Sequence, residues 1–387
     1  GSLIRRGPAY TEKSLFAQID EHGSLQLVNH LGIELGETPE QVFQNLEQQN
    51  YVINQSEDWN GQIWAEQYAE NLRDTTSPTP TRYNGNPAYL HESSGCSGKL
   101  AVFAVRLPTF EAGSDSTTYF ISSNHEVELI QLRKYLLENL TVLPSQAEYI
   151  HHQAFELTRR YAKHMYKIID IFGAEKIPTL FALKAKLDRF FKSVPLLPNN
   201  SFDRFIQLLN SLTPTWIEPR LQKFQKKYQH HLVIKTEQVQ QDELQQLLTK
   251  FFKGEIEQFF QCTPEEEKNA FLIRFAVGGC LIYYCESEGI NPNERLVSFD
   301  VALRRNDQQW LIDLPEHLQQ QVIMESCCGH FFCFVCHQDY LLKEGVDAHQ
   351  FKNEVLAYLE QRGATYPAEH NVGHIYHAST EYQEHLK

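Results

Sequence analysis

The chain has 387 residues, more than one typical hydrophobic core organises, so two or three compact units are expected. Hydrophobic residues make up 42% of it and aromatic residues 12%, which is enough to fill ordinary cores and excludes an intrinsically disordered protein. A formal net charge of −14 argues against a nucleic-acid-binding protein, because the chain as a whole would repel phosphates.

The N-terminal region combines a predicted hairpin with polar loops. Residues 15–19 and 25–28 are apolar runs on either side of the turn sequence Asp20 to Gly23, a pattern typical of a β-hairpin. Residues 37–90 are rich in Gln, Asn and Asp, and we expect them to be irregular.

Strands and helices of moderate length alternate along the rest of the chain. A loop punctuated by Gly95 and Gly98 enters a strongly apolar strand at 100–105. The later predicted strands are 118–122, 231–235 and 296–304, and the predicted helices are 126–140, 241–253 and 346–361. This alternation predicts an α+β fold, into which a basic block is inserted.

The basic block, residues 151–231, stands out in an otherwise acidic chain. It holds 14 Lys and Arg against 6 Asp and Glu and therefore carries +8, whereas the remainder carries −22. Such a surface suits an anionic partner, either lipid or nucleic acid. Tyr161, Met165, Ile168 and Phe172 recur at helical spacing, and no nucleic-acid-binding motif is present, which favours helices in the lipid headgroup layer. The alternative is an ordinary amphipathic bundle with a solvated basic face.

The most apolar run, residues 271–285, is the nearest approach to a transmembrane segment. It is too short to span a bilayer and is interrupted by Arg274 and a pair of glycines, so we expect a buried helix or strand. A buried Arg274 needs a carboxylate partner, which is either a protein side chain or a bound substrate.

Cysteine and histidine are concentrated in residues 327–339. Cys333, Cys336 and His337 have the C-x-x-C-H spacing of c-type haem attachment, which would require export, and no export signal is seen. A structural zinc site is the second interpretation, but a second C-x-x-C is missing. We favour a buried strand whose cysteines act as small hydrophobes in a reducing compartment, with His330 and His337 pointing into a site.

A second candidate site lies near the C-terminus. Glu369 and His370 are adjacent in a loop that follows a predicted helix ending near Gly363. Histidine has a suitable pKa for accepting a hydroxyl proton, and a neighbouring carboxylate raises its basicity. A simple helix-connecting turn is the alternative.

Taken together, these segments resemble the respiratory, quinone-linked D-lactate dehydrogenases, a branch of the vanillyl-alcohol-oxidase type of FAD enzymes. The likeness covers essentially the whole chain. Its most specific stretches are residues 6–12 (RGPAYTE), 29–33 (NHLGI), 92–96 (ESSGC), 302–307 (ALRRND) and 366–374 (YPAEHNVGH).

The resemblance implies a fold made of three parts. They are the second half of a vanillyl-alcohol-oxidase type FAD-binding domain, a ferredoxin-like cap, and a helical, basic membrane-binding domain inserted into the cap. The implied bounds are 1–108 and 360–387 for the FAD domain, 109–150, 228–265 and 290–359 for the cap, and 151–227, with 266–289 as a candidate addition, for the membrane domain. The chain looks like a fragment that lacks the N-terminal part of the FAD domain.

The resemblance also implies the cofactor and its contacts. Bound FAD would approach the backbone at Gly95, Gly98 and Val102 with its adenine end. Peripheral docking through residues 151–227 on anionic phospholipid, at the cytoplasmic side of the inner (plasma) membrane, would bring the enzyme to its quinone. Nucleic acid is not expected as a partner.

The implied reaction is oxidation of D-lactate to pyruvate. Arg274 would bind the substrate carboxylate, His370 would take the hydroxyl proton, and His330, His337 and Glu369 would orient the hydroxyl. No metal is expected, although residues that match His330, His337 and Glu369 can hold a divalent ion in related enzymes. An FAD-dependent dehydrogenase or oxidase of another 2-hydroxy acid and a non-catalytic peripheral membrane protein remain as alternatives.

Overall fold

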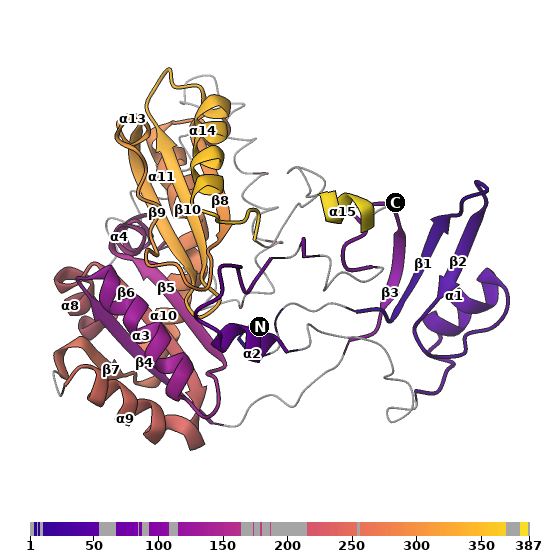
Figure 1. Cartoon of the computed structure of the whole chain (residues 1–387), viewed down its shortest axis with the longest axis horizontal. Helices are drawn as coiled ribbons and strands as arrows, with labels where there is room; N and C mark the ends of the chain where they lie inside the picture. The colour runs from indigo at the N-terminus through magenta and orange to yellow at the C-terminus, as the bar shows by residue number, and fades with distance from the viewer. Residues whose placement is uncertain are drawn as a thin grey trace.

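The computed structural model describes residues 4–5, 7, 11–53, 67–83, 85–86, 93–107, 115–163, 173, 179, 186, 215–253, 256–368 and 380–385. The strands in this part of the chain form one sheet of seven strands and one of three. Figure 1 shows the two sheets apart, with the C-terminal helix α15 (Thr380–His385) on the side of the three-stranded sheet.

The seven-stranded sheet has the order β7-β4-β6-β5-β9-β10-β8, and all neighbouring strands are antiparallel. Its strands are β4 (Ser116–Ser123), β5 (Gln146–His151), β6 (His230–Glu237), β7 (Phe259–Gln261), β8 (Leu296–Ala302), β9 (Val322–His330) and β10 (Val335–Leu342). Together with α3 (Glu126–Asn139) and α9 (Gln241–Phe251), strands β4 to β7 make a β-α-β-β-α-β unit. The α+β and ferredoxin-like predictions are therefore confirmed, and β8 to β10 extend the unit.

Helices cover both faces of this sheet. Successive side chains of a strand point to opposite faces, so Tyr119 and Phe120 belong to different cores. The Tyr119 face is covered by α3, α9 and α14 (Ala348–Gln361). The Phe120 face is covered by α4 (His152–Tyr161), α8 (Pro219–Lys227), α10 (Pro264–Ala276) and α11 (Cys280–Glu288). Burial on both sides explains why β4 is almost continuously buried.

The three-stranded sheet contains the predicted hairpin. Its order is β2-β1-β3, with β1 (Ser14–Ile19), β2 (Leu25–Asn29) and β3 (Ala101–Val105) all antiparallel. Gly23 has a φ of 80°, and Asp20 Oδ1 accepts hydrogen bonds from the backbone N–H groups of His22 and Ser24. The turn residues therefore close the hairpin as their chemistry predicts.

The prediction that residues 37–90 are irregular is wrong in two places. Helices α1 (Pro39–Glu47) and α2 (Tyr68–Arg73) lie within this stretch. Thr38 and Gln41 form a capping box around Pro39, which occupies the first helical position. Thr38 and Gln41 satisfy backbone N–H groups at the helix start, and Pro39 has no N–H that needs a partner. A helix therefore forms even though the segment is polar.

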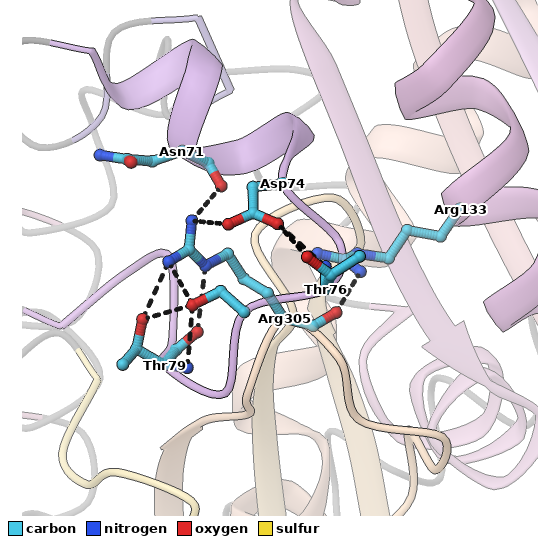
Figure 2. A network of polar contacts seen from close by, with 7 residues as sticks. Asn71, Asp74, Thr76, Thr79, Arg133 and Arg305 are labelled. Carbon is cyan, nitrogen blue, oxygen red and sulfur yellow. Dashed lines mark hydrogen bonds and ion pairs between the residues drawn. The ribbon is translucent and has the colours of Figure 1, made fainter.

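The segment 67–83 is fastened to the seven-stranded sheet, although it precedes all of its strands in sequence. Tyr68 and Leu72 of α2 are buried in the core of the Tyr119 face. Figure 2 shows Arg305 at the centre of a polar network, where it donates to the carbonyl oxygens of Asn71 (2.6 Å) and Thr79 (3.1 Å). Arg133 in turn donates to the carbonyl oxygen of Arg305 at 3.2 Å. Charge-assisted bonds from one planar guanidinium to several loop atoms fix the path of this loop.

The most apolar run forms a longer helix than predicted. Residues Pro264–Glu288 continue through α10, the 3₁₀ turn η5 (Val277–Gly279) and α11 over 25 residues. A capping box of Thr263 and Glu266 begins the helix, which explains why its length was underestimated: polar residues form its first turns. Within the described residues it is the single helix long and apolar enough to cross a membrane, but 39% of its most apolar window is buried in the fold. The prediction of a buried helix is confirmed for the face that packs on the sheet.

Candidate active site

The two predicted histidines lie together on one hairpin. His330 ends β9 and His337 lies in β10, opposite Cys328, so both side chains are on the Phe120 face of the sheet. Their ring centroids are 5.3 Å apart with the ring planes at 84°. The resemblance implied that these two histidines act together, and the hairpin register brings them together.

The cysteines around these histidines are core residues. Cys327, Cys328, Cys333 and Cys336 are all buried. Neighbouring strand residues point to opposite faces, so Cys336 and His337 do not present a common C-x-x-C-H surface for haem. Within the described ranges, no group of three His, Cys, Asp or Glu is placed to hold a metal ion. The expectation that these cysteines are buried small apolar residues is confirmed, but the expected single strand is wrong, because residues 331–334 form a turn between β9 and β10.

Glu148 is the central residue of the site, and the sequence analysis did not identify it. It lies on β5 directly opposite His330 on β9. His330 Nδ1 is 3.2 Å from Glu148 Oε1, and Arg274 Nε donates to Glu148 Oε2 at 2.9 Å. Burial alone would raise the pKa of Glu148, but the hydrogen bond with His330 and the charge of Arg274 outweigh it, so this pKa lies below its ordinary value. The carboxylate is therefore ionised at neutral pH.

Arg274 projects from α10 toward the sheet and meets this carboxylate. Its side chain and that of Glu148 are both only 17% exposed. The expectation that a buried Arg274 needs a carboxylate is confirmed, and the partner is a protein side chain. Glu148 therefore holds the Nε edge of the guanidinium.

Asp300 completes the row of polar groups. It lies on β8 opposite His337, and its Oδ1 is 3.4 Å from His337 Nδ1. Charged and titratable groups therefore form a row, from Arg274 on α10 through Glu148, His330 and His337 on neighbouring strands to Asp300 on β8. This arrangement can bind an anion at its arginine end and hold two imidazoles beside it.

The second predicted pair, Glu369 and His370, lies outside the described residues. The segment immediately before this pair, residues 365–368, lies within the described residues and runs along β8. Ala302 pairs with Thr365, and the backbone N–H of Ala368 donates to the carbonyl oxygen of Asp300 at 3.0 Å. Ala368, which precedes Glu369, is thus hydrogen-bonded to Asp300, the residue that pairs with His337 across the sheet.

An open cleft adjoins the row. It has a volume of about 1480 Å³, and Glu148, Arg274 and His330 line one part of it. Other parts of its wall come from β4, β6 and the apolar side chains of α10. The cleft is far larger than a three-carbon acid requires, since pockets of roughly 300–1,000 Å³ hold drug-sized ligands.

The predicted cofactor contacts belong to the other sheet. Gly95 and Gly98 have φ values of 133° and 82°, in the range that favours glycine. Val102 follows on β3 and is 40% exposed. Tyr382 of α15 donates to the carbonyl oxygen of Gly95 at 3.1 Å, which ties the C-terminal helix to this loop. These residues are not part of the row of polar groups around Glu148.

A family model described as "D-lactate dehydrogenase, membrane binding" matches residues 118–387. The quinone-dependent D-lactate dehydrogenase of Escherichia coli K12 is 43% identical over 98% of this chain and 66% of its own length. The enzymes of the same name from Haemophilus influenzae and Corynebacterium glutamicum are 41% and 37% identical, over 67% and 68% of their lengths. The chain thus spans about two thirds of the length of these relatives.

Solved structures with a more distant likeness include a methylhydroxylase, an oxidase and a synthase. p-Cresol methylhydroxylase is 10% identical with a TM-score of 0.38 over 100% of this chain and 62% of that one. 4-Ethylphenol oxidase from Gulosibacter chungangensis gives 0.39, at 10% identity over 96% and 61%. Alkyldihydroxyacetonephosphate synthase gives 0.35, at 10% identity over 72% and 43%. From the family model and the close relatives, the chain belongs to the membrane-binding D-lactate dehydrogenase family.

Proposed function

We propose that the protein is a peripheral membrane flavoenzyme that oxidises D-lactate to pyruvate and passes the electrons to quinone in a respiratory chain. The observation that carries this proposal is the identity of 37–43% to three quinone-dependent D-lactate dehydrogenases over at least 98% of the chain. The row of Arg274, Glu148, His330 and His337 beside an open cleft supports it, because these groups suit a small hydroxy acid anion.

In this proposal Arg274 binds the carboxylate of D-lactate through a charge-assisted fork. Glu148 holds the guanidinium and the His330 ring in place, and His330 and His337 orient the C2 hydroxyl together with Glu369. His370 accepts the hydroxyl proton. The flavin supplies the hydride acceptor.

FAD is the proposed cofactor, and the described residues fit its adenine end. The loop with Gly95 and Gly98 leaves open space at Gly98, where an added Cβ would meet nothing within 4 Å. Beyond it, Val102, Phe103 and Val105 of β3 expose 40%, 51% and 47% of their surfaces. An apolar strand exposed in this way is a surface that a ligand or partner covers.

The proposed docking surface is the basic block on anionic phospholipid at the cytoplasmic side of the inner membrane. Most of residues 151–227 lie outside the described residues. In α8 the described part has Leu221 and Phe224 buried in the core, whereas Lys223, Lys226 and Lys227 are exposed. The cations of α8 therefore face outward, which suits electrostatic attachment of about 1 kcal/mol for each cation near an anionic surface.

Turnover of the full-length protein tests the enzymatic proposal. D-lactate oxidation is measured with a water-soluble dye as acceptor, against L-lactate and a panel of other 2-hydroxy acids. Preference for D-lactate is expected. A different preferred acid would reassign the substrate, and a purified protein with neither flavin absorbance nor turnover would leave the non-catalytic alternative.

Flotation with liposomes tests the docking proposal separately. Binding should require anionic lipid and weaken as salt rises, since the Debye length falls from about 10 Å at 0.1 M to 3 Å at 1 M. Binding that ignores both lipid charge and salt would contradict electrostatic docking.

A further inference from the structure

The cleft beside Arg274 has a second part that lactate binding does not use. Arg274 and Glu267 are seven residues apart on α10, which separates the two ends of the cleft by roughly 10 Å at 1.5 Å per residue. At the Glu267 end, Lys235 Nζ lies 2.7 Å from Glu267 Oε1, and Thr118 Oγ1 donates to Glu267 Oε2 at 2.8 Å. Two ligands can therefore occupy different parts of one cleft.

The wall of the second part is apolar and aromatic. Phe271 and Leu272 of α10 line this part, and Phe275 lines the cleft one turn beyond Phe271, at the level of Arg274. Phe275 is 57% exposed, which is unusual for an aromatic residue on a helix that otherwise packs in a core. The ammonium of Lys235 lies 5.6 Å from the centre of the Phe271 ring, so a hydrogen-bond donor sits beside a flat apolar surface.

An apolar stripe continues this wall out of the cleft. Phe271, Phe275, Gly278 and Ile282 recur at i, i+4, i+7 and i+11 and therefore share one helix face. Ile282 is 39% exposed, and an added Cβ at Gly278 would meet nothing within 4 Å. The stripe is thus an open track of about 11 residues that begins at the aromatic wall and leads along the helix.

We propose that this outer part of the cleft is the binding site for the isoprenoid quinone, an inference that rests on the proposed function. The quinone ring lies against Phe271, and its carbonyl oxygens accept hydrogen bonds from Lys235 and the Gln261 amide, both of which line the cleft. The tail passes Phe275 and follows the stripe toward Ile282. Oxidation of D-lactate to pyruvate releases two electrons and two protons, and reduction of quinone to quinol takes up the same two electrons and two protons.

One feature favours a quinone over a lipid acyl chain as the occupant. A lipid tail has no polar atom to match the Lys235–Glu267 pair that lines the cleft, whereas a quinone is a flat acceptor on an apolar tail.

Photolabelling of the full-length, flavin-loaded protein in detergent tests the site directly. The probe is a decyl-tailed quinone with an azido group on its ring, and labelled peptides are identified by mass spectrometry. Label is expected within residues 261–275 and is competed by unlabelled quinone. Label confined to other segments would overturn the proposal, whether or not the protein oxidises lactate.

Kinetics with two acceptors give the second test. Phe275→Glu should raise KM for the decyl-tailed quinone by about 10-fold or more, because an aromatic surface that the bound quinone would cover is replaced by a charge. Turnover of D-lactate with a water-soluble dye should stay unchanged. The matched control is Val127→Glu on α3, which is equally exposed at 59% but lies over the opposite face of the sheet.

The tail path is tested by Ile282→Glu, which should raise KM for the decyl-tailed quinone but not for a tail-less quinone. If Phe275→Glu weakens binding to vesicles but leaves KM for quinone unchanged in detergent, the stripe contacts lipid only and the proposal is wrong. A parallel loss of dye-linked turnover would also contradict it. Absence of dye-linked turnover in the unmodified protein would instead refute the proposed function.

Discussion

The two sheets of this protein differ in how completely they are covered. The seven-stranded sheet has helices on both faces, and Phe120, Ile121 and Val233 are fully buried. The three-stranded sheet leaves Ile19 and Leu25 71% and 78% exposed, together with much of β3. Apolar surface of this extent on a sheet marks a place where something else binds. The first sheet therefore builds its own site, whereas the second presents a surface to a ligand or to further protein.

The largest expected effect comes from replacing a valine by glutamate in each sheet and comparing the loss of stability. Val233→Glu would bury an unpaired carboxylate in the seven-stranded sheet and should cost at least about 4 kcal/mol of the free energy of unfolding. Val102→Glu on β3 should cost about 1 kcal/mol or less, because a charge there reaches water. Urea unfolding measures both.

The amount of bound flavin tests whether the exposed strand β3 is a cofactor surface. Val102→Glu should lower the ratio of bound flavin to protein even though the fold is kept. A full flavin complement in Val102→Glu would show that β3 is not part of the cofactor surface.

The next effect concerns the proposed base. His370→Ala in the full-length enzyme should lower turnover at least about 100-fold, the usual contribution of a general base. His317→Ala, which removes a 66% exposed histidine on α13 (Glu316–Gln319), is the control and should be neutral. Retained turnover in His370→Ala would move the base to His330 or His337.

Glu148→Gln should lower kcat/KM for D-lactate by about 10-fold, mainly through KM, because the neutral amide no longer anchors Arg274 by charge. The exposed pair of Glu257 and Lys227 offers a control, since Glu257→Gln removes a carboxylate that contributes little to activity or stability. An unchanged KM in Glu148→Gln would mean that Arg274 does not bind the substrate.

The same variant has a pH signature. The pKa of Glu148 lies below its ordinary value of 4.5, so its ionised form stabilises the fold above that pH. This stabilisation is lost as the pH falls below about 4.5 through the lowered pKa. Urea unfolding should therefore show Glu148→Gln less stable than the unmodified protein at pH 7, and the difference should disappear in acid.

The last prediction concerns residues 74–80, a loop between β2 and β3 that Arg305 fastens to the seven-stranded sheet. Arg305→Ala removes the donor that holds the loop at Asn71 and Thr79 and should cost about 1–3 kcal/mol. Limited proteolysis should then cut residues 74–80 faster. Lys134→Ala, which removes a half-buried cation that donates to Gln308 rather than to Asn71 or Thr79, should leave the cleavage rate unchanged.

Much of the fold and half of the site follow from local sequence. Asp20 and Gly23 close the predicted hairpin through their own side-chain and backbone chemistry. The pairing of His330 with His337 depends on a second hairpin, where a single strand was expected. The capping boxes at Thr38 and Thr263 were overlooked as local signals, which is why α1 was missed and the helix that begins at Pro264 was predicted too short. Whether a segment forms a helix depends more on satisfied backbone groups at its start than on how polar its composition is.

The sequence by itself determined that Arg274 must find a carboxylate and that the cysteines near His337 suit a strand. Only the tertiary structure decided that the carboxylate is Glu148, which is 126 residues away and appears in sequence as an ordinary strand residue. It also decided that the apolar helix buries one face and leaves the stripe from Phe271 to Ile282 beside the cleft. Periodicity states which residues share a face, but the partner of that face depends on strand order and register, which are long-range properties of the fold.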